Sequence, residues 1–303
     1  MTNLVALFLD NLLPIFLAAF TGFLLAKWLN LDPRTLSQVV FFIFSPCLVF
    51  RLLTGSELDA SDLVRMIGFA ALVILIIGVI TWVVGKFLRL ERRTMMALLL
   101  TAMFMNAGNF GLSVNLFAFG NDGLAQASLY FVTSGILSYT IGVLIASMGT
   151  LSFREALIDL RKIPTVYAVF LGVLFMVFDW KLPGPVDKTV NLLASAAIPA
   201  MLVLLGMQFQ RAEWRQNRLP LALSNILRLV IGPLLALSLS PLIGLHGVAF
   251  QAGVLESAMP TAVFTTILAT QYDLEPSFVT TAVFTSTILS PLTLTPLLAF
   301  LVG

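Results

Sequence analysis

Long apolar runs, separated by short polar stretches, follow one another along the whole chain. A helix that crosses a bilayer needs about 20 mostly apolar residues, and most of these runs approach or exceed that length. The pattern predicts ten membrane-spanning helices, at residues 11–29, 35–54, 63–88, 95–119, 124–149, 163–179, 187–209, 217–241, 247–271 and 276–301. Because the connections are short and contain no low-complexity linker, we expect an all-α integral membrane protein.

The same pattern indicates an internal duplication. The longest polar stretch, residues 152–162, separates the fifth predicted span from the sixth near the middle of the chain. Across it, residues recur in order at a nearly constant spacing: Pro14 with Pro164, Gly22 with Gly172, Pro46 with Pro199, and Ser134 with Ser286. Shared membrane composition is the alternative explanation for such matches. Their order and spacing favour two copies of one unit.

Each copy holds five predicted spans, an odd number, so the second copy must insert in the opposite orientation. We therefore expect a 5+5 inverted repeat, with residues 1–150 as the first five-helix unit and residues 163–303 as the second. Residues 151–162 would form a short cytoplasmic connection. Inverted repeats are a recurring plan of secondary transporters, which bind their substrates near the bilayer midplane.

Basic residues in the connections indicate how the chain is oriented, because cytoplasmic loops carry an excess of Lys and Arg. Twelve follow odd-numbered spans: Lys27, Arg34, Lys86, Arg89, Arg92, Arg93, Arg154, Arg161, Lys162, Arg211, Arg215 and Arg218. Four lie on the opposite side: Arg51, Arg65, Lys181 and Lys188. We expect the larger group to face the cytoplasm, which places both termini on the non-cytoplasmic side of a plasma (inner) membrane.

Composition narrows the functional classes. Only 11% of the residues are charged and 59% are hydrophobic, whereas a soluble domain is about 25% charged. A net charge of +2 without a basic stripe argues against nucleic acid as a partner. The single Cys47 and single His246 cannot form the usual metal clusters. No nucleophile–base pair or phosphate-binding loop is present, so we expect neither an enzyme nor a cofactor.

The ninth predicted span contains an unusual combination, one carboxylate at Glu256 and a helix-breaking proline, Pro260, one turn later. Both are costly in lipid and are tolerated where they line a cavity or are buried in protein. The repeat spacing sets Asn106 opposite Glu256, within the glycine- and asparagine-rich run MNAGNFGLSVN of the fourth span. We expect both spans to break near their middles and to cross there.

This crossing is the predicted substrate site. Its candidate substrate-binding residues are Asn106, Gly108, Asn109, Gly111, Ser113, Ser257, Pro260, Thr261 and Arg228. The alternative for the glycines is that they only allow close helix packing. Ser134 and Ser138, with their repeats Ser286 and Ser290, are further candidates to face the crossing, although bonding to their own helix is the commoner fate of such hydroxyls. Gln208 is expected at the membrane interface.

Arg228 is the only other charge deep in a predicted span. It lies at about the same depth as Glu256, some 20 Å from the turn between their two spans at 1.5 Å per residue. Two interpretations stay open. The pair forms a permanent ion pair between helices, or Arg228 attracts an anionic substrate while Glu256 couples transport to H⁺ or Na⁺.

Three motifs carry a resemblance to a known family. SPCLVF in the second span, NAGNFGLSV followed by FGNDG in the fourth, and SAMPTAVF in the ninth resemble the auxin efflux carrier family. The resemblance implies ten helices in a plan related to the bile acid:sodium symporters. Spans 1, 2, 6 and 7 would then form a scaffold, often dimeric, and spans 3–5 and 8–10 a moving transport domain. The implied substrates are organic anions such as malate, malonate or auxin.

The chain departs from the plant carriers of that family in two respects. Its connection after the fifth span is short, and only its second crossing has a proline, which favours a prokaryotic-type member. We expect a secondary active transporter that moves a small organic anion through a lipid bilayer by alternating access; a homodimer fits the implied scaffold. The alternatives are a channel of the same architecture and a ligand-binding membrane receptor that does not translocate its ligand.

Overall fold

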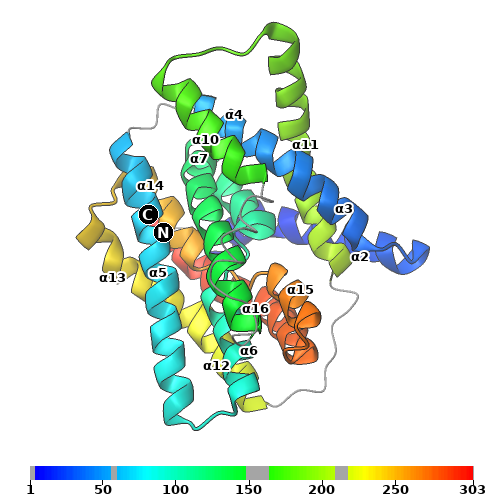
Figure 1. The fold of residues 1–303 in the computed structure, drawn as a ribbon, viewed down its shortest axis with the longest axis vertical. Helices are drawn as coiled ribbons and strands as arrows, with labels where there is room; N and C mark the ends of the chain where they lie inside the picture. The colour runs from blue at the N-terminus through cyan, green and yellow to red at the C-terminus, as the bar shows by residue number, and fades with distance from the viewer. Residues whose placement is uncertain (1–3, 56–59, 148–163, 209–217, 303) are drawn as a thin grey trace.

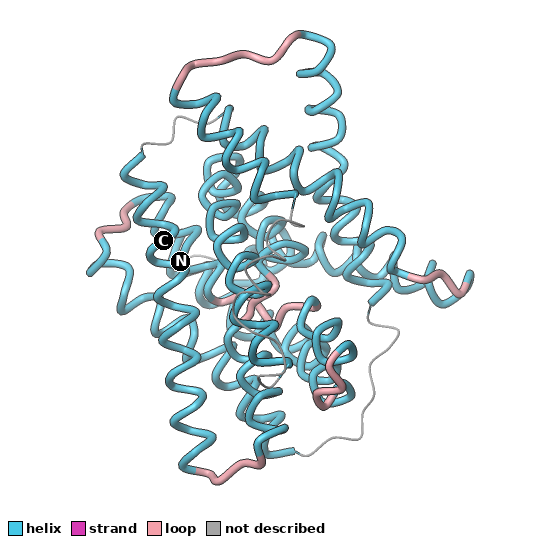
Figure 2. Tube along the Cα trace, viewed as in Figure 1, coloured by secondary structure: helices cyan, strands magenta, loops and turns pink. Residues whose placement is uncertain are grey.

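The computed structural model describes residues 4–55, 60–147, 164–208 and 218–302. Within these ranges every regular element is a helix (Figures 1 and 2). The predicted connection at residues 151–162 lies outside them. The prediction of an all-α protein is confirmed.

The elements are named here in chain order, with η marking short π-helical turns. In the first half they are α1 (Leu4–Leu7), η1 (Phe8–Leu12), α2 (Leu13–Leu29), α3 (Pro33–Val39), η2 (Val40–Phe44), α4 (Ser45–Gly55), α5 (Ala60–Phe87), α6 (Arg92–Met103), η3 (Ala107–Leu112), α7 (Ser113–Leu137), η4 (Ser138–Gly142) and α8 (Val143–Ser147). In the second half they are α10 (Pro164–Val177), α11 (Gly184–Gln208), α12 (Arg218–Ile226), η7 (Leu227–Ile231), α13 (Gly232–Ile243), α14 (Gly247–Ser257), α15 (Phe264–Gln271) and α16 (Pro276–Val302).

Seven stretches of helix in the described ranges are long and apolar enough to cross a membrane. They are Leu4–Leu29, Pro33–Gly55, Leu63–Phe87, Ala107–Ser147, Gly184–Gln208, Arg218–Ile243 and Pro276–Val302. Ala107–Ser147 bends at Gly120, whose φ of 67° is not helical, so it covers parts of two predicted spans. The ninth predicted span is divided between α14 and α15, which are each too short alone. The count of ten spans therefore stays a prediction.

The chain ends and restarts its helices with ordinary local signals. Asn30 adopts the left-handed conformation after α2, and Asp32 then caps α3 by accepting a hydrogen bond from the backbone N–H of Arg34 at 3.0 Å. Pro33 stands at the first position of α3, where its missing N–H costs nothing. These signals place the turn between the first two membrane helices.

The helices pack in two groups. In one, α2 lies along α11 and α10 lies along α4. The glycines Gly22 and Gly206 allow α2 and α11 to approach closely. A Cβ added to either one would collide with backbone atoms of the facing helix. In the other group, α5, α6, α7, α13 and α14 pack against one another (Figure 1). The division into a scaffold and a moving transport domain stays a prediction.

Large apolar side chains cover much of the outside of the molecule, as expected for a surface in contact with lipid. Trp28 and Phe87 are among those that lie exposed. The interior contains an unusual share of polar side chains, including the fully buried Arg228 and Glu256. Such groups are costly inside a membrane protein unless they are paired or functional, and both lie close to the breaks in the helices.

Candidate functional site

Two helices end in the middle of the protein and cross there. α6 ends at Met103 and α14 ends at Ser257, and new helices begin at Ala107 and at Phe264. Between them the two strands of chain pair as an isolated antiparallel bridge from Met105 to Thr261. The structure thus places a break in each of the two spans in which the sequence predicts one.

Hydrogen bonds between the two breaks hold the crossing together. The backbone N–H of Asn106 donates to the carbonyl of Pro260 at 2.7 Å, and the N–H of Ala262 donates to the carbonyl of Phe104 at 2.9 Å. The side chains of this region add further links. The hydroxyl of Thr261 donates to the carbonyl of Thr101 at 2.9 Å. Unwound backbone inside a membrane protein is stable only where its polar groups are satisfied in this way.

The local sequences explain why the helices break here. Pro260 has no N–H to continue α14, so the carbonyl of Glu256 instead accepts the N–H of Met259, at 3.1 Å, in a tighter turn. The first break has no proline and relies on close approach. A Cβ on Gly108 would lie 2.8 Å from the Phe131 ring, and a Cβ on Gly111 would collide with the Glu256 carboxyl group. A side chain at either position would therefore force its neighbour to shift.

The carbonyl oxygens that end α6 and α14 are all hydrogen-bonded. In α14, the last four are taken by the N–H groups of Ala258 and Met259 and by Arg228. In α6, Thr261 binds one, and the guanidinium of Arg228 donates through Nη1 to the carbonyls of Ala102 at 2.8 Å and Met103 at 3.4 Å. These carbonyls are therefore occupied by groups of the protein itself.

By contrast, backbone N–H groups at the starts of the next helices lack hydrogen-bond acceptors in the described part of the chain. Within the described residues, the backbone N–H groups of Gly108 and Asn109 at one start, and of Val263 and Phe264 at the other, have no hydrogen-bond acceptor. The first N–H groups of any helix lack an intrahelical partner. Asn106 precedes the first start, and its side chain does not cap it. Two half-helices thus present unsatisfied donors at the crossing.

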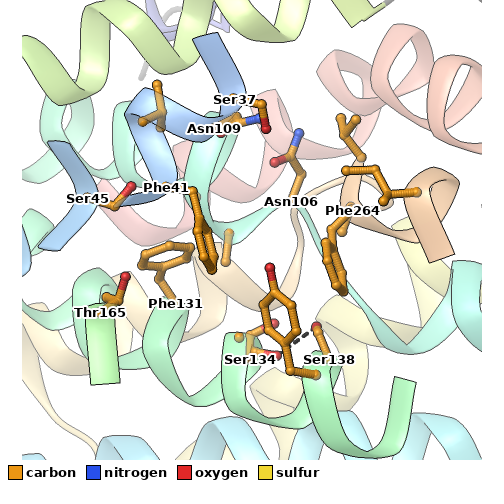
Figure 3. A pocket seen from close by; sticks show the side chains of 18 of the residues that line it. Ser37, Phe41, Ser45, Asn106, Asn109, Phe131, Ser134, Ser138, Thr165 and Phe264 are labelled. Atoms are coloured by element: carbon orange, nitrogen blue, oxygen red, sulfur yellow. Dashed lines mark hydrogen bonds between the residues drawn. The ribbon is translucent and has the colours of Figure 1, made fainter. Parts of the chain in front are cut away.

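A cavity of about 480 Å³ lies beside these helix starts. Asn106, Gly108 and Asn109 line it from one half-helix, and Val263 and Phe264 line it from the other. Figure 3 shows the amide of Asn106 among these side chains, with the rings of Phe41, Phe131 and Phe264 around the space. None of the described residues that line the cavity carries a formal charge. Its surface is mostly apolar, formed by aliphatic and aromatic side chains, with amide and hydroxyl groups among them.

The cavity lies toward one side of the protein. Its lining includes Ser37 near the start of α3, Thr165 near the start of α10, Gln208 at the end of α11, and Tyr272 directly after α15. Each position adjoins a connection that follows an odd-numbered predicted span. Most basic residues of the connections belong to that same side, so the cavity lies on the predicted cytoplasmic side of the crossing.

Glu256 lies behind the crossing and does not line the cavity. It is fully buried, and its Oε1 accepts a hydrogen bond from Nδ2 of Asn115 at 3.0 Å. Asn115 also donates to the carbonyl of Gly111 at 3.0 Å, which ties the pair to the first half-helix. Oε2 of Glu256 has no hydrogen-bond partner among the described residues. Asn115 ends the asparagine-rich run of the fourth predicted span but is not among the residues predicted for the site.

Arg228 forms no direct ion pair with Glu256 in the described structure. Its Nη1 donates to the carbonyls at the end of α6 and its Nη2 to the carbonyl of Ser257, whereas its buried Nε has no partner among the described residues. The permanent ion pair considered from the sequence is therefore absent, because the ends of two helices attract the guanidinium instead. Arg228 also lies outside the cavity lining, so it does not contact the space where a substrate would bind.

The structure divides the predicted substrate residues into two sets. Asn106, Gly108 and Asn109 line the cavity. Gly111, Ser113, Ser257, Pro260 and Thr261 do not, and their polar groups serve the crossing or their own helices. Among the weaker candidates, Ser134 and Ser138 line the cavity, and so does Gln208, whose buried Oε1 has no hydrogen-bond partner among the described residues. The aromatic lining was missed, because phenylalanine is common throughout this sequence.

Two broken helices that cross beside a cavity in an all-helical protein are an architecture typical of membrane transporters. Comparison with known families is more specific. The membrane transport protein family matches residues 7–155 and 147–298, nearly the whole chain. The chain belongs to this family, that of the auxin efflux carriers.

Individual relatives of the chain also carry the names of transporters. A protein of Methanothermobacter thermautotrophicus named "Uncharacterized transporter" is 30% identical over 261 residues, which cover 86% of both chains. A Rhizobium meliloti protein named "Putative malonate transporter" is 24% identical over 302 residues, which cover 94% of this chain and 93% of the relative. Auxin efflux carrier component 8 of Arabidopsis thaliana is 27% identical over 148 residues, 45% of this chain and 39% of its own. The chain is therefore a membrane transporter.

Proposed function

We propose that this protein is a secondary active transporter that moves a small organic anion across the membrane by alternating access at the crossing. One observation carries the proposal. The carbonyl oxygens that end α6 and α14 are hydrogen-bonded within the protein, whereas the N–H groups that begin the next helices, beside the cavity, are not. A site that offers N–H donors and withholds carbonyl oxygens favours an anion over a cation.

The helix starts also supply positive charge. Each helix N-terminus is equivalent to about half an elementary charge, so two of them beside one cavity offset about one unit of negative charge. Asn106 lines the cavity, and its buried Nδ2 has no acceptor among the described residues. A carboxylate would satisfy these donors. Two relatives are named after malonate and auxin, and both compounds are organic acids.

The rest of the cavity suits the remainder of such a substrate. A volume of about 480 Å³ is in the range of small-molecule sites. The rings of Phe41, Phe131 and Phe264 offer apolar surface, and Ser134 and Ser138 offer hydroxyl groups (Figure 3). Recognition would thus combine a fixed anion site at the crossing with a mixed wall around the organic part.

The transport cycle in this proposal follows from the inverted repeat. The cavity faces the predicted cytoplasmic side, so the structure corresponds to an inward-facing state. Exchange of conformations between the two repeats would move the crossing relative to the scaffold and expose the same helix starts to the other side. Glu256 is the proposed ion-coupling group, since it is buried next to the crossing with one oxygen unpaired.

Counterflow in proteoliposomes tests the proposal. Purified protein is reconstituted with unlabelled malonate or indole-3-acetate inside, and uptake of the same labelled acid is followed from outside. We expect saturable uptake that the internal acid accelerates, and no such uptake in protein-free liposomes. Flux that rises in proportion to concentration would favour the channel. Thermal stabilisation by the acids without any uptake would favour the receptor.

A further inference from the structure

One guanidinium contacts the ends of both helices that stop at the crossing. Nη1 of Arg228 donates to the carbonyls of Ala102 and Met103 at the end of α6, and Nη2 donates to the carbonyl of Ser257 at the end of α14. These helices belong to different halves of the chain. Arg228 is the link between their two C-terminal ends, and it approaches them from η7, a third element.

The charges balance without a carboxylate. Each helix C-terminus is equivalent to about half a negative elementary charge, so the two ends together offset about one positive charge. Arg228 is completely buried and has no carboxylate in hydrogen-bonding contact among the described residues. A buried cation without compensation would be very costly in a membrane protein. The two helix ends supply that compensation.

The same kind of position takes an ion in other carriers. Where transporters have broken helices, the unwound carbonyls and the C-terminal ends of half-helices coordinate coupling cations such as Na⁺. Here those oxygens are already bound by a cation that the chain itself provides. The next turn of the helix leaves room for it: a Cβ on Gly232 would lie 2.5 Å from Nη2 of Arg228 and 3.2 Å from the Ser257 carbonyl.

We infer that Arg228 takes the place of a coupling metal cation at the crossing, and that transport therefore does not depend on Na⁺. Arg228 is a positioning residue: it holds the ends of α6 and α14 together so that the starts of the next helices face the cavity. This inference rests on the proposed transport function. It removes Na⁺ as the coupling ion at these carbonyls and leaves H⁺ as the candidate for Glu256.

The first experiment replaces Na⁺ by choline at constant ionic strength and measures initial uptake of labelled malonate and indole-3-acetate by wild-type proteoliposomes. We expect rates that agree within about twofold. A saturable rise in rate with Na⁺, by threefold or more, would overturn the inference. If neither acid is transported, the same exchange of Na⁺ for choline in thermal unfolding of the detergent-purified protein decides, and a Na⁺-dependent rise in melting temperature would overturn it.

The second experiment restores the missing cation chemically. Arg228→Ala leaves the carbonyls without a donor, so uptake should fall at least tenfold and the melting temperature should drop. Guanidinium at 5–20 mM, about a hundredfold below the concentrations that denature proteins, should recover part of both, and choline should recover neither. The wild-type protein should gain nothing. Full uptake and stability of Arg228→Ala without any added cation would contradict the inference.

Gly232→Ala keeps the inference testable if Arg228→Ala does not fold. The added methyl displaces the guanidinium from Ser257 without removing it, so uptake should fall several-fold while the protein stays folded. Gly68→Ala is the matched control, because no atom lies within 4 Å of a Cβ added there on α5. Equal uptake by the two glycine variants would contradict a positioning role for Arg228.

Discussion

Asn106→Asp is the sharpest test of the anion site at the crossing. The substitution keeps the shape of the side chain and leaves the backbone hydrogen bond from residue 106 to Pro260 in place. It converts a buried amide, 5% exposed and with an unpaired Nδ2, into a carboxylate at the start of a half-helix. If the site binds an anion, the protein would then supply a competing anion of its own.

The magnitude follows from electrostatics. Two unit negative charges about 6 Å apart, at an effective dielectric constant of about 20, repel each other by about 3 kcal/mol. That corresponds to about a hundredfold weaker substrate binding. The free energy of unfolding should change little, because the helix start stabilises a carboxylate by up to about 1 kcal/mol and burial of the new charge opposes that gain.

The assay is concentration-dependent uptake in proteoliposomes together with thermal unfolding. We expect KM for the transported acid to rise by between tenfold and a hundredfold, with a melting temperature that changes little. Asn121→Asp is the control, because it adds the same charge at an exposed position next to Gly120. A KM within twofold of wild type for Asn106→Asp would refute the argument that the helix starts bind the anion.

Three further predictions concern the residues around the crossing. Glu256→Gln should abolish coupled transport while leaving a folded, inserted protein; unchanged uptake at every pH and Na⁺ concentration would show that Glu256 is not the coupling group. Gly111→Ala should lower stability by about 1–3 kcal/mol, since its methyl collides with the Glu256 carboxyl group; a loss no larger than that of Gly68→Ala, in thermal unfolding, would contradict this. Thr261→Val removes the hydroxyl bound to the carbonyl of Thr101, and should cost about 1–3 kcal/mol; an unchanged melting temperature would contradict it.

The positions of the breaks could be predicted because they have local causes. A proline inside a long apolar run removes one donor whatever surrounds it, so Pro260 marks a break from sequence alone. The first break was harder to predict, because Gly108 and Gly111 permit a break in the helix without requiring one. The repeat spacing supplied the missing evidence by setting this run opposite the Glu256–Pro260 segment.

The cavity wall could not be predicted in the same way. Phe41 and Phe131 belong to different helices and to residues of a type that occurs 25 times in the chain. Only the folded structure brings Phe41 of η2 and Phe131 of α7 to the wall of one cavity. Ser134 and Ser138 were recognisable as candidates because they recur in the repeat, yet their copies Ser286 and Ser290 do not line it. The two halves of the chain thus contribute unequally to the site.

Arg228 shows why a residue can be found from sequence and its partner still be missed. Depth in the membrane singled out Arg228 and Glu256 as two opposite charges, and a permanent ion pair between them was one of the two interpretations left open. The sequence does not display the carbonyls of Ala102, Met103 and Ser257, because every residue has one and only a helix end leaves it unpaired.

Once both helices break, their ends are a stronger attraction for a guanidinium than a carboxylate it does not reach. Glu256 is then left with a single hydrogen bond, from Asn115. The same two breaks therefore fix the arginine and leave the acid apart from it, and the proposal of proton-coupled, sodium-independent transport rests on this arrangement.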